Sequence, residues 1–177
     1  VVKRRRLPVL ASATAIAACL ASCSGGEVSL VPADYRSWSR ATERPLDYPV
    51  PGHLDNYRVV YANDAARRWS TETRDGRTIV TYPAGAVFVK EVYAGSGRPA
   101  EGASPQMLTV MVKAPGDRRA VRGWLFVTRN PATGEEGVVK QQLCAECHAA
   151  ANDRHTYGEG NPAGELRDGV FIRPPRL

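Results

Sequence analysis

The sequence predicts an α+β fold built on a small antiparallel β-sheet, with short helices and one helix near the C-terminus. Three observations predict it: short runs of β-branched and aromatic residues, turn residues between these runs, and a late run of helix-forming residues. A chain of 177 residues has room for one domain of this kind. Its composition, 43% hydrophobic and 24% charged, is that of a globular protein.

Residues 1–22 have the pattern of a secretory signal peptide. The basic stretch KRRR precedes an apolar, Ala-rich run that is too short for a comfortable transmembrane helix. The run ends in LASC, which resembles the bacterial lipobox, so we expect cleavage before Cys23 and lipidation of Cys23. A plain signal peptide with an incidental cysteine is the alternative. The pattern predicts an exported protein, either periplasmic or held on a membrane surface by its lipid.

The net charge of +6 does not indicate a nucleic-acid-binding surface. Four of the 24 basic residues lie in the expected signal peptide, which contains no acidic residue. The remainder of the chain has 20 basic residues against 18 acidic ones, a net charge of +2. We therefore exclude nucleic acid as a partner.

The domain is expected to span residues 34–160, between a tether and a tail. Ser, Gly and Pro residues predict a short tether over 23–33, and the composition of 161–177 predicts a Gly/Pro-rich tail. The domain begins with DYRSWSRAT, which predicts a short amphipathic helix with Asp34 as its N-cap. The proline-rich segment 45–56 is predicted as a loop.

Four segments are predicted as strands, because β-branched and aromatic residues dominate them and turn residues flank them. They are residues 58–62, 86–93, 107–113 and 124–128. Between the first two, NDAARRW predicts a helix capped by Asn63 or Asp64, and RDGRT predicts a turn. The final helix is expected within 135–151.

The motif CAECH places Cys144, Cys147 and His148 in the spacing of c-type haem attachment. The two thiols would form thioethers with the haem vinyl groups, and His148 would be the proximal ligand of the iron. A thioredoxin-like redox pair is disfavoured, because in such proteins the C-x-x-C motif lies early in a βαβ unit, whereas here it lies near the end of the chain. A zinc site would need a fourth ligand from His53 or His155, with poor spacing. The sequence therefore predicts one covalently attached haem c.

The position of the motif indicates that the other side of the iron is open. His53 or His155 would be the alternative sixth ligand, although each is better explained as a surface or loop histidine. No methionine follows His148, so the downstream sixth ligand of ordinary class I cytochromes c is missing. Met107 and Met111 have the spacing of core residues in a strand. The predicted strands exclude the four long helices of a bundle cytochrome c′. An iron with an open position binds small molecules.

Together these segments resemble the cytochrome P-460 family, which includes the β-sheet cytochromes c′ (cytochrome c′-β). The matching pieces are YRSW, RVVYAN with a helix ending in Trp69, PAGAVFVKE, MLTVMVK, GWLFV and CAECH, over roughly residues 34–157. The resemblance implies a β-sheet haem pocket, the ligands hydroxylamine and nitric oxide, and a redox-partner cytochrome. Because family members are often dimers, it implies a homodimer as well.

The resemblance also implies roles for Lys90 and Arg58. In cytochromes P-460 a lysine at the VKE position is crosslinked to the haem macrocycle, whereas cytochromes c′-β work without the crosslink. Strand alternation places Lys90 on an otherwise apolar face with Ala86 and Phe88, where a free ammonium is costly. The alternative is a lysine that reaches solvent or a haem propionate. Arg58 would approach the distal pocket or a propionate; a solvated strand-edge arginine is the alternative.

Two functions stay open at the level of the sequence. The first is an oxidoreductase that oxidises hydroxylamine or acts on nitric oxide, with Lys90 and Arg58 as its catalytic residues. The second is a cytochrome without turnover, which binds nitric oxide or transfers electrons. A crosslink between Lys90 and the haem would separate the two.

Overall fold

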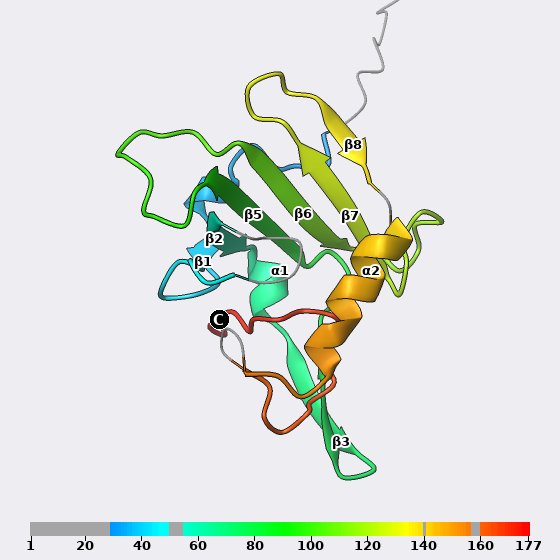
Figure 1. Cartoon of the computed structure of the whole chain (residues 1–177). Helices are drawn as coiled ribbons and strands as arrows, with labels where there is room; N and C mark the ends of the chain where they lie inside the picture. The colour runs from blue at the N-terminus through cyan, green and yellow to red at the C-terminus, as the bar shows by residue number, and fades with distance from the viewer. Residues whose placement is uncertain (1–28, 50–54, 140, 157–159) are drawn as a thin grey trace, which may run out of the picture.

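The computed structural model describes residues 29–49, 55–139, 141–156 and 160–177. The expected signal peptide and Cys23 lie outside the described residues. Within them the chain forms a six-stranded antiparallel sheet, a separate two-stranded hairpin and several short helices (Figure 1). This confirms the predicted α+β class with a small antiparallel sheet. In the described ranges, no helix is long and apolar enough to cross a membrane.

The large sheet has the strand order β1-β2-β5-β6-β7-β8, and every neighbouring pair is antiparallel. Its strands are β1 (Ser39–Arg40), β2 (Asn56–Ala62), β5 (Val87–Ala94), β6 (Met107–Lys113), β7 (Trp124–Arg129) and β8 (Glu136–Val138). The four strands predicted from the sequence correspond to β2, β5, β6 and β7. They form the centre of the sheet, where burial on both faces favours β-branched and aromatic residues.

The first helix is shorter than predicted. Only the 3-10 helix η1 (Tyr35–Ser37) forms, and the side chain of Asp34 makes no capping hydrogen bond. After Trp38, residues Ser39 and Arg40 pair with the end of β2 as strand β1, so this stretch finds its backbone partners in the sheet. The second predicted helix is α1 (Asp64–Arg67), which Asn63 caps by accepting a hydrogen bond from the backbone N–H of Ala66 at 2.8 Å.

The hairpin of β3 (Ser70–Arg74) and β4 (Arg77–Thr81) was not predicted. The D-G turn between the two strands was predicted. Both of its residues have positive φ, 51° at Asp75 and 74° at Gly76. This conformation suits the twist of a two-residue hairpin. Every side chain of β3 is exposed, so its sequence carries no alternation between apolar and polar residues.

The final predicted helix is also shorter than expected. Residues 136–138 form strand β8 along β7, and the helix α2 (Gln141–Ala149) is followed by the 3-10 helix η2 (Ala150–Asn152). Strand β8 has a further role, because the carboxylate of Glu136 accepts hydrogen bonds from the Ser29 hydroxyl at 2.7 Å and the Leu30 N–H at 2.6 Å. The end of the expected tether is thus held against the sheet.

The large sheet has two covered faces. On the first, here called the site face, helix α2 and the C-terminal segment pack against the sheet (Figure 1). Its buried residues include Val60, Ala62, Phe88, Trp124, Phe126, Ala145, Val170 and Ile172. The second, the far face, packs against the N-terminal segment, and its buried residues include Val31, Tyr35, Val89, Val110, Leu125 and Val127.

A buried carboxylate organises the far face. Glu91 in β5 is 2% exposed and accepts hydrogen bonds from the Tyr35 hydroxyl at 2.7 Å and the Tyr93 hydroxyl at 2.8 Å. The Arg36 side chain donates a third at 2.7 Å, which forms an ion pair. Burial and the bond to Glu91 raise the pKa of Tyr35 and raise that of Tyr93 to about 12.

The two tyrosines give the fold a predictable alkaline limit. Tyr93 has a folded pKa of about 12 against an ordinary value of 10.0, so the folded state holds its proton where the unfolded state releases it. We expect the free energy of unfolding to fall as pH rises from about 10 to about 12. Tyrosinate absorbance alongside denaturant unfolding measures this. In the control Glu91→Gln, Tyr93 should titrate closer to its ordinary pKa; identical titrations in both proteins would contradict the assignment.

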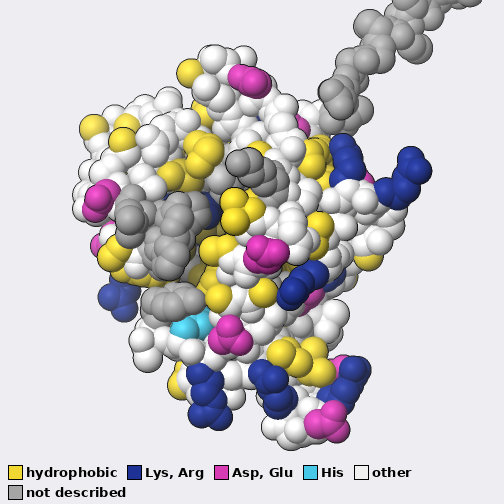
Figure 2. All heavy atoms as spheres, turned by 45° about the vertical axis from the view of Figure 1, so that its right-hand side comes forward, with side chains coloured by type: hydrophobic (Ala, Val, Ile, Leu, Met, Phe, Trp, Pro, Cys, Tyr) yellow, Lys and Arg dark blue, Asp and Glu magenta, His cyan; other side chains and the backbone are white. Residues whose placement is uncertain are grey.

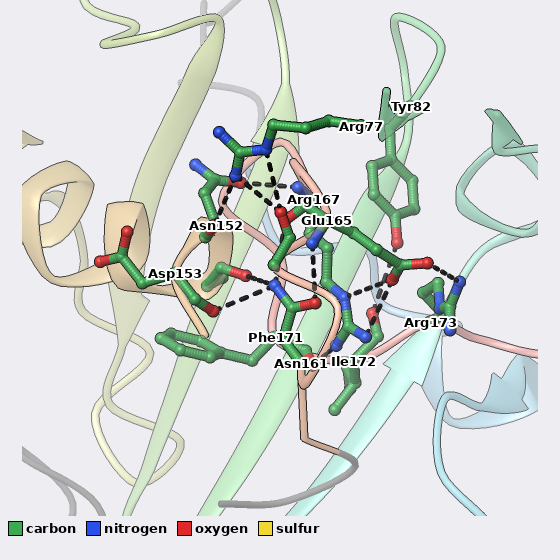
Figure 3. A network of polar contacts seen from close by, with 12 residues as sticks. Arg77, Tyr82, Asn152, Asp153, Asn161, Glu165, Arg167, Phe171, Ile172 and Arg173 are labelled. Carbon is green, nitrogen blue, oxygen red and sulfur yellow. Dashed lines mark hydrogen bonds and ion pairs between the residues drawn. The ribbon is translucent and has the colours of Figure 1, made fainter. Parts of the chain in front are cut away.

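The C-terminal residues, predicted as a Gly/Pro-rich tail, pack against the domain. We call residues 160–174 the closing segment. Asn161 is fully buried and its amide donates to the carbonyl oxygens of Ala151, Asp153 and Glu165 at 3.0–3.1 Å (Figure 3). The N–H of Glu165 donates back to it at 2.9 Å, and the Glu165 carboxylate pairs with Arg167 at 3.0 Å. These contacts fasten the closing segment to η2, directly after the motif helix.

Replacing Asn161 with alanine is expected to lower the free energy of unfolding by about 3 kcal/mol, because several buried polar groups lose their partner. Denaturant unfolding at equal haem content measures the loss. Asn130→Ala is the matched control, because Asn130 caps an exposed loop through the N–H of Ala132 at 2.9 Å. We expect that control to cost no more than about 1 kcal/mol. Equal losses in the two variants would argue against a structural role for the buried amide.

Candidate haem site

Helix α2 places the three residues of the motif on one side. Cys144, Cys147 and His148 stand at i, i+3 and i+4, the spacing of neighbours on a helix surface. Both cysteines are free thiols; Cys144 is partly buried against the site-face core, and Cys147 is exposed. Burial raises the pKa of the Cys144 thiol, and the neighbouring Cys147 adds to the effect. The pair therefore offers two reduced thiols one helical turn apart.

The imidazole of His148 is oriented by the closing segment. Its Nδ1 lies 2.9 Å from the carbonyl oxygen of Gly169. A carbonyl oxygen only accepts, so Nδ1 carries the proton and the lone pair of Nε2 remains for a metal. The rings of Phe126 and Phe171 both pack against it, with centroids 5.2 Å and 5.6 Å from that of His148. Burial lowers the pKa of His148 to about 4, which keeps it in the neutral, metal-binding form.

Strand β5 brings Lys90 to the same place. In the sheet register Lys90 lies opposite Val60 of β2 and Thr109 of β6, on the site face beside Phe88. Negative charge on Cys147 or Cys144 would raise the pKa of Lys90, although both cysteines stand 54 or more positions later in the chain. Burial, aided by the charge of Arg58, lowers the pKa of Lys90 to about 8. The structure therefore joins the lysine and the attachment motif in one site.

Arg58 is buried on the site face, where it is 2% exposed. The solvated strand-edge alternative is therefore wrong. Its Nε donates to the carbonyl oxygen of Leu46 at 3.1 Å, and its Nη2 donates to that of Tyr48. The guanidinium also lies 5.3 Å from the centre of the Tyr48 ring. Burial lowers the pKa of Arg58. The arginine thus secures the loop before β2 and places a second cation near Lys90.

The two methionines behave as the sequence predicted. Met111 packs against the site-face core, and Met107 is partly buried in the same strand. Beside Met111, a small cavity of about 80 Å³ lies between the sheet and α2. Its lining includes Trp124, Phe126, His148 and Gly169.

Sequence reasoning missed the closing segment as part of the site. Gly169 and Phe171, which hold the His148 ring, lie in the stretch predicted as a tail. The only local signal was the D-G pair at 168–169, and both residues have positive φ, 53° and 76°. A D-G pair predicts a turn, but it does not reveal which side chain the turn contacts.

The described residues fit a c-type haem; His53, one possible fourth ligand of a zinc site, lies outside them. Among the residues with described positions, no group of three His, Cys, Asp or Glu side chains is arranged to hold a metal. The Cys pair, the free Nε2 of His148 and the apolar surroundings are the groups that c-type haem requires. Figure 2 shows hydrophobic side chains gathered in the central part of this side of the molecule, with Lys and Arg mostly in its lower and right-hand parts.

Comparisons with known proteins agree with this reading. A family model described as Cytochrome P460 matches residues 32–171, which include the motif helix and the closing segment as far as Phe171. A search of curated proteins finds no match. The family supports a haem-binding, iron-binding cytochrome of the monohaem c type. With most of its length matched and the attachment motif in place, the chain belongs to the cytochrome P460 family.

Proposed function

We propose that the protein is an exported monohaem c-type cytochrome with an open axial site, which binds nitric oxide and oxidises hydroxylamine. The observation that carries the proposal is the position of Lys90 on the site face, opposite Val60 and Thr109, where the charges of Cys144 and Cys147 influence its pKa. A haem attached to those thiols would lie beside Lys90. Lys90, which stands at the crosslinking position of cytochromes P-460, would then be close enough to the cofactor to form that bond.

Each residue of the site has a separate task in this proposal. Cys144 and Cys147 attach the haem, and Nε2 of His148 ligates its iron. When bound, the haem supplies a redox-active iron that takes small nitrogen compounds on its open side. Arg58 adds positive charge near Lys90 and lowers its pKa, which favours the neutral amine that reacts with carbon. Joining the Lys90 nitrogen to a haem carbon removes two hydrogens, so it requires an oxidant of the peroxide class.

Location and partners follow from the same proposal. Electrons from hydroxylamine leave through a redox-partner cytochrome, because one haem cannot store all that are released. Haem c is attached outside the cytoplasm, which agrees with the expected signal peptide. A lipid on Cys23 would hold the protein on a membrane surface. The strands at the sheet edges would allow a homodimer.

Denaturing mass spectrometry and an absorption spectrum of the reduced protein test the proposal. We expect a haem-bearing peptide that also contains Lys90, together with a strongly red-shifted Soret band. An ordinary c-type spectrum with nitric oxide binding would replace the oxidase by a nitric-oxide-binding cytochrome. A reduced protein that is low-spin and does not bind nitric oxide would overturn both open-site functions and leave electron transfer.

A further inference from the structure

We propose that Asp168 and Lys113 are positioning residues that set how strongly His148 donates electrons to the haem iron. The inference rests on the proposed function, because it takes His148 as the axial ligand. It concerns a second layer of side chains behind that ligand, and neither residue belongs to the attachment motif.

Lys113 and Asp168 form a largely buried ion pair. The Lys113 ammonium lies 2.8 Å and 2.6 Å from the two carboxylate oxygens of Asp168. Their side chains are only 13% and 20% exposed. Trp124 reinforces the pair, because its Nε1 donates to the backbone carbonyl of Asp168 at 2.8 Å and its ring lies 4.9 Å from the ammonium. Lys113 ends β6 and Trp124 begins β7, so Asp168 is fixed to the ends of two paired inner strands of the large sheet.

The ion pair stabilises a turn whose backbone conformation is unfavourable at Asp168. Asp168 and Gly169 both have left-handed backbone conformations, with φ of 53° and 76°. A non-glycine residue adopts this conformation at an energetic cost, and the contacts of its side chain offset that cost. A Cβ added at position 169 would lie 3.5 Å from the carbonyl oxygen of His148, so the turn sits directly on the motif helix. Its result is that the Gly169 carbonyl faces Nδ1 of His148 at 2.9 Å.

This carbonyl controls the chemistry of the imidazole. Hydrogen bonding from Nδ1 to an outer-shell acceptor raises the basicity of a ligating histidine and fixes its ring orientation. A more basic ligand stabilises ferric iron relative to ferrous iron, so it lowers the reduction potential. If the ion pair is broken, the turn loosens and the Gly169 carbonyl moves away from Nδ1. We then expect a weaker bond between iron and His148 and a higher reduction potential.

The test uses the haem-loaded full-length protein and two readouts that are independent of turnover. Resonance Raman spectroscopy of the reduced protein gives the iron–histidine stretching frequency, and a redox titration gives the potential. We expect Lys113→Met and Asp168→Asn to lower the frequency and raise the potential. Lys113→Arg keeps the ion pair and should restore values near those of the wild type. The matched control is Asp117→Asn, which breaks the Asp117–Arg119 pair at 2.8 Å in another loop.

Each outcome of this experiment decides something. Wild-type frequency and potential in Lys113→Met and Asp168→Asn would overturn the inference, even if both variants were less stable. A shift of equal size in Asp117→Asn would overturn it too, because the effect would then be one of net charge. If Asp168→Asn fails to fold, Lys113→Met alone is judged by the same criterion. A wild-type protein without an iron–histidine stretch would instead contradict His148 as ligand, and with it the proposed function.

Discussion

Replacing Lys90 with methionine is expected to abolish hydroxylamine oxidation while haem attachment continues. Turnover should fall by on the order of 100-fold or more, as it does when a catalytic group is removed. The Soret band should return to the position of an ordinary c-type haem, because methionine cannot form the crosslink. Steady-state oxidation with an artificial electron acceptor, together with the mass of the haem peptide, measures both changes. Unfolding is not the expected cause, since methionine replaces a partly buried cation by an apolar side chain of similar length.

Lys90→Arg is the control that separates charge from bond formation. Arginine keeps the positive charge beside Arg58 but is never a neutral amine at ordinary pH. If the crosslink matters, the arginine variant should lose activity and the red shift as fully as the methionine variant. Full turnover in either variant would show that the site oxidises hydroxylamine without the crosslink.

Removing the imidazole of His148 is the second change with a large expected effect. In His148→Ala the thioethers should still form, because Cys144 and Cys147 remain, but the iron loses its proximal ligand. We expect a changed reduced spectrum, loss of the five-coordinate reaction with nitric oxide, and a loss of turnover comparable to that at Lys90. Added imidazole should restore part of the spectrum, because the variant vacates the space beside Phe126 and Phe171 that the His148 ring fills.

The chain offers a matched control for this variant. His155 also contacts Phe171, with ring centroids 5.6 Å apart, but it is not part of the attachment motif. His155→Ala should therefore leave the spectrum and nitric oxide binding unchanged. Nitric oxide binding and spectra that are unchanged in His148→Ala would show that another residue ligates the iron.

The sheet could be predicted where its strands are buried, and not elsewhere. Strand β5 is recognisable because buried β-branched and aromatic residues fill it. Strand β3 has the same backbone form, but its exposed polar residues carry no pattern of burial. Strand β8 is defined by its partner β7, and residues that pair with a distant strand can equally begin a helix when read alone.

The same distinction applies to the site. A motif with fixed spacing identifies Cys144, Cys147 and His148, and period-2 alternation places Lys90 on the correct face of its strand. The acceptor for His148 lies 21 positions downstream, in a stretch that composition describes as turn-rich. Neither composition nor periodicity records such a contact, because it depends on how the closing segment returns to the helix. The buried amide of Asn161 that guides this return also looks like an ordinary turn residue in the sequence.

The adjacent positions of Lys90 and Glu91 fix the register of strand β5 in the sheet. The lysine is directed to the motif on one face, and the carboxylate is held by Tyr35 and Tyr93 on the other. Inserting or deleting one residue before them would exchange the two charges between the faces. The site face would then lose its lysine, and the far face would lose its carboxylate. Changes in chain length are therefore confined to connections such as residues 95–106, and a library built on this scaffold can vary that loop while leaving β5 unshifted.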